Sequence, residues 1–437
     1  MLTAFSRAFK TPELRKKLLF TVFILSIFRL GSHIPTPGVS YVAVQQCQPA
    51  SGQGNQILGL ANLFSGGALL QLSIFALGIM PYITASIIVQ LLTVVIPRFE
   101  TLKQEGQTGQ AKLTQYTRYL SIGLAVLQSS TFVTFARNPA TLFPGSNCDK
   151  ILVNDNIATV ALMVLTMTAG TGLIMWMGEL ITERGVGNGM SLLIFTSIAA
   201  GFPGSLWAIK QREGRWDTFL LVILLGFVII GIVVFVEQCQ RRIPVQYAKR
   251  MVGRRMYGGT TTYIPLKVNQ ANVIPIIFAA SLLAIPGLVV QFYQGNLNPP
   301  AWVQWVQAHL IQGDSPYYMA LYTLLIVFFT FFYVSISFNP EEVADNMKKY
   351  GGFVPGIRAG RPTAQYLSYV LNRITVVGAT YLAIVSLIPL IALVMVGANQ
   401  NFPFGGASIL IIVGVGLETV KQIESQLKQH HYEGFLR

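Results

Sequence analysis

The sequence is poor in charge, in cysteine and in histidine. Only 11% of its 437 residues are charged while 52% are hydrophobic, a balance that excludes a soluble multidomain protein. Its 3 cysteines and 4 histidines have no metal-ligand or redox spacing. The HExxH and GxSxG motifs and the glycine-rich phosphate loop are also absent, so a metal enzyme, an ATPase and a redox carrier are unsupported. We therefore expect no catalytic residues, no metal site and no cofactor.

Charge is also scarce inside the apolar runs. The ionisable residues nearest to them, Arg29, Glu179, Glu237 and Glu418, all lie close to the ends of runs. An ion-coupled transporter needs ionisable residues within the membrane, because these form its proton relays and ion sites. A secondary transporter and a passive membrane scaffold remain as rival interpretations, and the missing charge argues against the transporter.

Ten apolar runs have spanning length or close to it, which is typical of an all-α polytopic membrane protein. The runs are 18–34, 73–96, 120–136, 157–177, 189–207, 218–237, 272–292, 317–337, 374–396 and 405–420. The first run is interpreted as a retained span, because no small-residue cleavage site follows it before His33. Few of the 31 Lys and Arg residues fall in the loops predicted to be external, so both termini are expected in the cytoplasm. The external ones are Arg137, Lys150, Lys210, Arg212 and Arg215.

Ten spans divide into two halves of five, and an odd number of spans inverts the second half relative to the first. We expect a cytoplasmic N-terminus at 1–17, a first half at 18–208, a second half at 209–425 and a cytoplasmic tail at 426–437. Inverted repeats place their special site between the halves, near the middle of the bilayer. Self-similarity between the halves is weak, so ten unrelated helices remain the alternative. Cys47 and Cys148 share one predicted side, so isolated thiols and a disulfide both stay open.

The run from Ile57 to Pro97 is apolar throughout, yet it is too long for one straight span. At about 1.5 Å per residue it would be roughly twice as long as a hydrocarbon core of about 30 Å. Ser65, Gly66 and Gly67 interrupt it after a first piece that is too short to cross. We predict a short re-entrant helix at 57–71. Non-helical backbone at membrane depth requires a protein-lined or watery cavity, so the site of function is expected there.

Ile79, Ile83 and Ile87 recur at intervals of four directly after this break and form one stripe on a helix face. Such a stripe most often contacts lipid or packs against another helix. A ring of branched apolar side chains can also close a pore by dewetting it. The position of the stripe favours the second interpretation, and both are retained.

Two cytoplasmic connections, 238–271 and 338–373, are longer than a link between spans requires. The first is predicted to be a projecting β-hairpin with strands on either side of Gly258 and Gly259. The second begins as a polar helix and becomes a Gly/Pro loop that carries Arg358 and Arg361. The basic residues of these loops suit contact with anionic lipid headgroups and docking to RNA or an acidic protein equally well.

Several long motifs resemble those of the bacterial members of the SecY family, the channel-forming subunits of the Sec protein translocase. They are LFSGGALLQLSIFALGIMPYITASIIVQLLTVVIP, GELITERGVGNGMSLLIF, YAKRMVGRRMY, PLKVNQANVIPIIFAASLL and FNPEEVADNMKKYGGFVPGIRAGRPTAQYL. The matches follow one another in order along almost the whole chain, and the number and orientation of the spans agree.

The resemblance implies an hourglass channel with an external plug, a central constriction and a lateral gate into lipid. It implies that the plug lies in 62–71, from Asn62, Leu63, Phe64, Ser65, Gly66 and Gly67 to Gln71. It implies that the constriction, the pore ring, consists of Ile79, Ile83, Met190, Ile194, Ile277 and Ile411. Met190 departs from the branched side chain often seen in the family, and its flexible thioether should still seal.

The resemblance further implies that the lateral gate lies between the spans 73–96 and 272–292. Its polar members would be Gln90, Gln128 and Ser281, and the residues that meet the motor or the ribosome would be Arg254, Arg255 and Arg358. The implied function is a non-enzymatic channel that passes unfolded, signal-bearing polypeptides across the bacterial plasma (inner) membrane and releases membrane helices into lipid. The implied partners are SecE and SecG, the SecA ATPase or a ribosome as the driver, the signal-bearing polypeptides and the membrane lipid.

Overall fold

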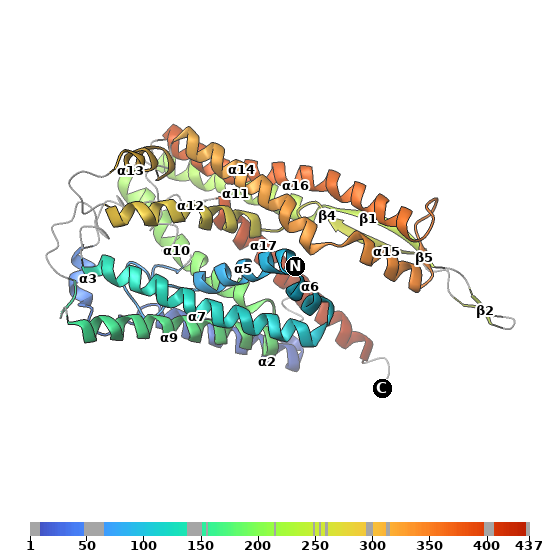
Figure 1. The fold of residues 1–437 in the computed structure, drawn as a ribbon, viewed down its shortest axis with the longest axis horizontal. Helices are drawn as coiled ribbons and strands as arrows, with labels where there is room; N and C mark the ends of the chain where they lie inside the picture. The colour runs from blue at the N-terminus through green and yellow to red at the C-terminus, as the bar shows by residue number, and fades with distance from the viewer. Residues whose placement is uncertain are drawn as a thin grey trace.

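The computed structural model describes residues 9–47, 65–137, 151–153, 156–213, 216–247, 250–252, 255–257, 261–293, 300–311, 315–396 and 406–433. Within these residues the chain is mainly helical, and its helices lie in two layers that run along the long axis of the molecule (Figure 1). The strands and α6 lie at one end of the layers, where α2 begins and α17 ends, and α3 and α13 lie at the other end.

Each of the ten predicted runs corresponds to one long helix. In the first half these helices are α2 (Pro12–Gly31), α5 (Met80–Val95), α7 (Gln107–Arg137), α9 (Ile157–Arg184) and α10 (Gly189–Glu213). In the second half they are α11 (Trp216–Gln238), α12 (Ile274–Tyr293), α14 (Pro316–Ser337), α16 (Arg361–Val396) and α17 (Gly406–Glu433). The shorter elements are α3 (Tyr41–Cys47), α6 (Pro97–Gln104), α13 (Ala301–Val306), the π-helical η1 (Gln307–Ile311) and α15 (Pro340–Lys349).

Few of the described helices are by themselves long and apolar enough to cross a membrane, although the sequence predicts ten spans. In the described part of the chain, three helical stretches are long and apolar enough to cross a membrane: Ile157–Arg184, Pro316–Lys349 and Arg361–Ile388. A fourth is obtained if Met80–Val95 and Pro97–Lys103, bent by 105°, count as one span. The 16 residues of α5 extend only about 24 Å at 1.5 Å per residue, so the segment before this helix must complete its crossing.

Proline and polar caps set several helix starts. Pro12, Pro97, Pro316 and Pro340 each stand in the first helical turn, where a missing N–H costs nothing. Ile96 is extended, as the residue before a proline prefers, and this explains the bend between α5 and α6. The helix α16 starts at Arg361, well before the predicted residue 374, and its added first turns pack into the core of the lobe through Leu367 and Val370.

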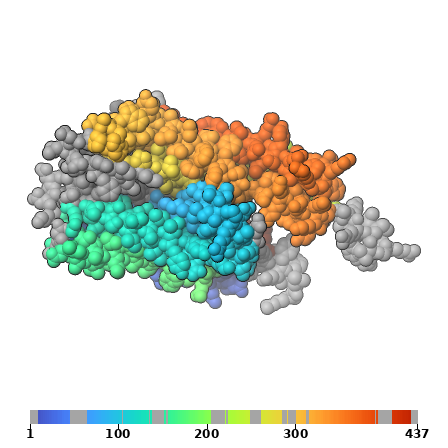
Figure 2. All heavy atoms as spheres, viewed as in Figure 1, coloured from blue at the N-terminus to red at the C-terminus, as the bar shows by residue number. Residues whose placement is uncertain are grey.

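The two halves meet mainly through α10. Within the first half α5 packs along α7 and α7 packs along α9, while in the second half α14 packs against both α12 and α16. Between the halves α10 packs against α17 and α11. Figure 2 shows the blue and cyan side chains of the first half meeting the yellow and orange ones of the second along a long seam.

The two long connections that are predicted to be cytoplasmic form a small lobe with a sheet, called the lobe below. β1 (Gln240–Tyr247) pairs antiparallel with β4 (Thr261–Lys267), and β5 (Gly352–Phe353) adds to the other edge of β1. β2 (Arg250–Val252) and β3 (Arg255–Tyr257) form a second ribbon that projects beyond α15 (Figure 1). The lobe has its own apolar core, which consists of Ile243, Val245, Leu266, Met347, Val354, Leu367 and Val370.

The predicted hairpin is present, but its turn was placed wrongly. Val252 pairs with Arg255, and Gln240 pairs with Lys267, so both ribbons share one register centred between Val252 and Arg255. The prediction had centred the hairpin on Gly258 and Gly259, which lie outside the described residues. The pair of glycines was a strong turn signal, and the pairing of the strands overrides it.

The segment before α5 departs most from the prediction. Residues 65–79 form successive turns, with positive φ at Gly66 (68°), Gly67 (89°), Leu72 (45°) and Gly78 (56°). The predicted span start at 73 is therefore wrong, since α5 begins at Met80. The described part of the predicted re-entrant helix, from 65 to 71, is also not helical, and 57–64 lies outside the described residues. Positive φ values interrupt helix geometry, and glycine tolerates them.

Candidate functional site

The first turn of α5 carries the isoleucine stripe into the interior. Ile79 is the N-cap of the helix, and its carbonyl accepts the N–H of Ile83 at 3.1 Å, so the two side chains lie one turn apart on one face. Ile79 is buried, with 3% of its surface exposed, while Ile83 and Ile87 are half-buried. All three pack into the largest apolar cluster of the described residues, which favours an interior role over lipid contact.

The six predicted pore-ring residues belong to this one cluster. Ile79 and Ile83 come from α5, Met190 and Ile194 from α10, Ile277 from α12 and Ile411 from α17. Four of them are buried, namely Ile79, Ile194, Ile277 and Ile411, and the other two pack against them. Both halves of the molecule thus contribute two helices to the same apolar centre. The role of these residues in closing a pore stays a prediction.

Met190 is accommodated by a glycine on the neighbouring helix. A Cβ added at Gly178 of α9 would lie 2.5 Å from the sulfur of Met190, so a larger residue at 178 would displace the thioether. A Cβ added at Gly189, which precedes Met190, would overlap the carbonyl oxygen of Gly178. The two glycines let α9 and α10 approach closely and leave room for a long, flexible side chain at position 190.

The turns before α5 are fixed by the chain that follows α2. The carbonyl of Leu72 accepts both the N–H of Thr36 at 3.0 Å and its hydroxyl at 2.8 Å. Ile74 N–H donates to the carbonyl of Ile34 at 2.9 Å, and Phe75 stacks on Phe28 with ring centroids 5.8 Å apart. These contacts replace the helical hydrogen bonds that the segment lacks, and they hold the start of α5 in place.

Sequence reasoning missed one polar contact on this segment. The guanidinium of Arg29, in the last turn of α2, donates from Nη1 to the carbonyl of Gly66 at 2.6 Å. The isolated position of Arg29 near the end of the first apolar run was the available signal. Its partner could not be foreseen, because the contact depends on the turns at 65–79.

The predicted gate residues lie on three different helices, and in the described part of the structure no hydrogen bond joins their side chains to one another. Gln90 on α5 is exposed, and Gln128 on α7 and Ser281 on α12 are half-buried. The hydroxyl oxygen of Ser281 is buried and has no hydrogen-bond partner in the described part of the structure. A serine hydroxyl without a partner in an apolar helix is a group that a neighbouring polar side chain or water would satisfy.

The predicted docking residues lie in or next to the lobe. Arg358 is exposed in the loop between β5 and α16, and its carbonyl accepts the hydroxyl of Thr363 at 2.8 Å. Arg255 belongs to β3. Arg254 lies outside the described residues. Because β5 pairs with β1, the structure joins the two basic connections into one lobe, which the sequence did not predict.

Charged and polar pairs elsewhere lock neighbouring helices. Arg118 of α7 binds Glu179 of α9 through two bonds of 2.7 Å each. The amide of Asn269 donates to Glu237 at 2.7 Å and also to the carbonyl of Asn272 at 3.2 Å, which closes the base of the hairpin against the start of α12. Within the described residues no group of three or more His, Cys, Asp or Glu is placed to hold a metal ion.

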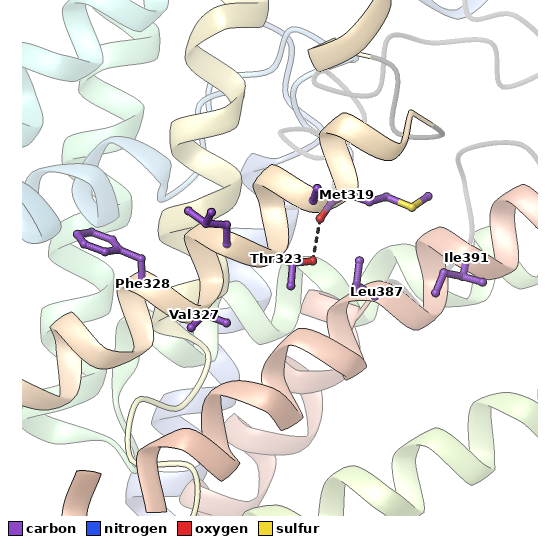
Figure 3. Close-up of a pocket in the computed structure, with 8 residues that line it drawn as sticks. Met319, Thr323, Val327, Phe328, Leu387 and Ile391 are labelled. Carbon is purple, nitrogen blue, oxygen red and sulfur yellow. Dashed lines mark hydrogen bonds between the residues drawn. The ribbon is translucent and has the colours of Figure 1, made fainter. Parts of the chain in front are cut away.

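An apolar pocket of about 730 Å³ lies between α14 and α16, away from the central cluster. Figure 3 shows its lining, in which Met319, Thr323, Val327 and Phe328 come from α14 and Leu387 and Ile391 from α16. The hydroxyl of Thr323 donates to the carbonyl of Met319 within its own helix at 2.7 Å. The pocket therefore presents almost only hydrocarbon, and none of the predicted site residues lines it.

The chain has relatives of known name over its whole length. A SecY family model matches residues 73–420. The protein translocase subunit SecY of Streptomyces scabiei is 65% identical over 440 residues, and the alignment covers 100% of each chain.

Two solved structures share the fold. One is a SecY protein, described for a plug domain that stabilises the closed state of the translocation channel and maintains a membrane seal. Its TM-score is 0.61 at 19% identity, and the match covers 94% of this chain and 91% of that one. The other is Sec61 in a canine ribosome–channel complex, with a TM-score of 0.58, 18% identity and coverage of 94% and 91%. At these identities the two structures establish similarity of fold.

Proposed function

The chain belongs to the SecY family, and on this premise we propose that it forms the protein-conducting channel of a membrane protein translocase. Its substrates would be unfolded, signal-bearing polypeptides, which pass through the centre, and membrane helices, which leave sideways into lipid. The chain offers no nucleotide-binding motif, so the energy comes from a separate driver.

One observation carries this proposal. Ile79, Ile194, Ile277 and Ile411 come from four helices, two in each half, and they converge in one apolar cluster. A narrow constriction lined only by branched apolar side chains excludes water and ions by dewetting. Such side chains can move aside for a polypeptide without forming hydrogen bonds to it, so the constriction passes many different sequences.

The plug and the lateral gate are the moving parts of the proposed channel. We infer that 62–71 is the plug, and its described residues, Ser65 to Gln71, lie directly before the segment that leads to Ile79. The gate would lie between α5 and α12, with Gln90, Gln128 and Ser281 as its polar members. Support for this position is that α5 packs along α7 and α12 along α14, in opposite halves.

Partners are proposed from the family and from the lobe. SecE and SecG would complete the complex, and SecA or a ribosome would drive it. The Sec61 structure of similar fold is described as part of a ribosome–channel complex, which supports the ribosome as one driver. We also propose that the chain lies in the bacterial plasma membrane, as its family membership suggests. The uneven distribution of Lys and Arg supports an orientation with both termini in the cytoplasm.

The decisive experiment is import of a precursor protein into proteoliposomes that contain this chain with SecE, SecG and SecA. A signal-bearing precursor should become protected from added protease when ATP is supplied, and vesicles that lack this chain should give no protection. If vesicles with the complete complex also leave the precursor accessible to protease, the proposed function is wrong.

The same assay tests the docking role of Arg358. Its side chain is exposed in the lobe, so Arg358→Glu should reverse the local charge without unfolding the chain. We expect SecA-driven import to fall by at least about tenfold, the order expected when a charged contact at an interface is reversed. Lys112→Glu, at an exposed site on α7, is the matched control and should import normally. Full import by Arg358→Glu would remove this residue from the docking surface.

A further inference from the structure

Arg29 occupies an unusual position for a charged residue. It lies in the last turn of the apolar helix α2, is half-buried, and belongs to the side of the membrane that carries few basic residues. Ionisable residues in spanning helices are costly and therefore usually have a specific partner. Among the described residues no carboxylate forms a salt bridge with Arg29, and the partner that it does have is the backbone carbonyl of Gly66 at 2.6 Å.

Gly66 is held from two sides. Its φ of 68° lies in the left-handed region, and a Cβ built on it would lie 3.1 Å from the Cα of Ser197 on α10. The glycine backbone therefore lies between the guanidinium of Arg29 and the backbone of α10. Gly67 also has a positive φ, of 89°, but a Cβ there would meet nothing within 4 Å.

The contacts on the chain after Gly66 are of a different kind. Leu72 and Ile74 are bound by the backbone at 34–36, and Phe75 stacks on Phe28. The hydrogen bonds at Leu72 and Ile74 are made by backbone groups and by the buried hydroxyl of Thr36. We therefore call residues 72–75 the anchor of this segment. Arg29 brings a guanidinium to the carbonyl of Gly66 in the turns at 65–71, and the ring Nδ1 of His33 lies 3.1 Å from Oε1 of Gln71 at their end. A charge-assisted hydrogen bond in an apolar setting is strong, yet it can be broken by hydration of the guanidinium alone.

We propose that Arg29 is a positioning residue that holds the plug in the closed channel by binding the carbonyl of Gly66. Opening then breaks this bond while the anchor at 72–75 remains, so the turns at 65–71, including Ala68, leave their place beside α10 together. The inference rests on the proposed function, because it takes Ser65 to Gln71 as the trailing part of the plug.

The first test measures ion conductance of the complete complex in planar bilayers. Arg29→Gln removes the charge and the reach of the guanidinium, and we expect open events to rise about 10- to 100-fold, the range for losing a hydrogen bond to a charged group. Arg29→Lys keeps a charged donor and should restore part of the seal. Ser26→Ala, one turn earlier on α2, removes a hydroxyl that bonds only to Val22 of its own helix and should conduct like the parent.

The second test reports the plug position without relying on conduction. Ala68 is fully buried, so Ala68→Cys in a chain whose native cysteines are replaced should react slowly with a membrane-impermeant thiol reagent added outside. Adding Arg29→Gln should raise the labelling rate about tenfold or more, by the same loss of bond strength. Equal labelling rates with and without Arg29→Gln overturn the inference.

The two tests separate the inference from the proposed function. If deletion of 62–71 opens the channel but Arg29→Gln changes neither conductance nor labelling, the proposed role of Arg29 is wrong. The proposed channel function is then unaffected. Arg29→Gln could instead speed labelling while neither Arg29→Gln nor the deletion of 62–71 raises conductance. In that case Arg29 does hold the plug, and the proposed sealing role of the plug is wrong.

A glycine pair tests the geometry independently of charge. Gly66→Ala and Gly67→Ala both add a Cβ at positive φ, and only the first presses it against Ser197. Gly66→Ala should therefore speed labelling of Ala68→Cys more than Gly67→Ala does. Equal labelling rates for the two variants would show that the packing of Gly66 between α2 and α10 does not hold the plug.

Discussion

At the scale of residues, the proposed seal depends on side-chain shape. Ile79 and Ile411 are 3% and 2% exposed, and neither offers a hydrogen bond to a passing polypeptide. Branched side chains at the end of a short helix fill the centre closely, and removing one leaves a cavity that water can enter. Leakage should therefore respond to changes at these few positions far more than to changes elsewhere.

This gives a prediction for Ile83→Gly and Ile277→Gly. Each removes a side chain that packs in the central cluster, so the ion leak of the reconstituted complex in planar bilayers should rise severalfold. Leu165→Gly is the matched control, because it puts the same helix-weakening residue at an exposed position of α9. Unchanged conductance in both isoleucine variants would contradict the pore ring.

The pore-ring positions could be proposed from the sequence, whereas Arg29 could not. The ring lies in long motifs that identify the family, and the spacing of Ile79 and Ile83 is visible without a structure. The bond from Arg29 to Gly66 joins residues far apart in the sequence through turns whose φ values no local pattern reveals. Hydrophobic periodicity in a sequence predicts regular helices and strands, and it cannot predict contacts that depend on irregular backbone.

At the scale of elements, the lobe formed by the two long connections is a unit with its own core. The hairpin was predicted from its strand-like residues, but β5 was not, because two residues are too short to produce a strand pattern. Likewise the start of α5 was placed too early, because an apolar sequence alone does not show that residues 73–79 bond to the chain after α2. Both errors have the same cause, which is that tertiary pairing overrode the local signal.

The core of the lobe can be tested with Leu367→Ala. Leu367 is fully buried among the apolar residues of the lobe, and truncation of a buried leucine costs about 2–5 kcal/mol. We expect faster proteolysis of the connections 238–271 and 338–373 and weaker binding of SecA, with normal bilayer conductance. Val376→Ala, exposed on the same helix, should change neither. Increased leak in Leu367→Ala would show that lobe and seal are not independent.

At the scale of the whole molecule, the arrangement of ten helices was the most predictable feature. Long apolar runs and the uneven distribution of Lys and Arg are properties that hold whatever the tertiary contacts, and each predicted run corresponds to one helix. The contact of the halves through α10 could not be deduced this way, because α10 differs little in composition from the other helices.

The separation of the halves leads to a prediction for the gate. In a chain without native cysteines, Gln90→Cys on α5 and Ser281→Cys on α12 can be joined by a flexible bifunctional thiol reagent. This ties the two halves together, so insertion of a nascent membrane helix into lipid should be lost, as measured by carbonate-resistant product. Joining Gln90→Cys to Ser130→Cys, at an exposed position of α7 outside the predicted gate, links α5 to α7 within one half and should leave insertion intact. If membrane helices are still inserted when Gln90→Cys is cross-linked to Ser281→Cys, the proposed gate is wrong.

The spacing of Ile79 and Ile83 has a consequence for the polypeptide itself. One helical turn along α5 spans only about 6 Å for four residues, while an extended chain advances about 3.3 Å per residue. The proposed constriction would therefore enclose roughly two residues of the substrate at any moment. Each bulky or charged substrate residue would therefore pass the constriction almost singly. The rate of transport should vary from step to step with the sequence of the substrate.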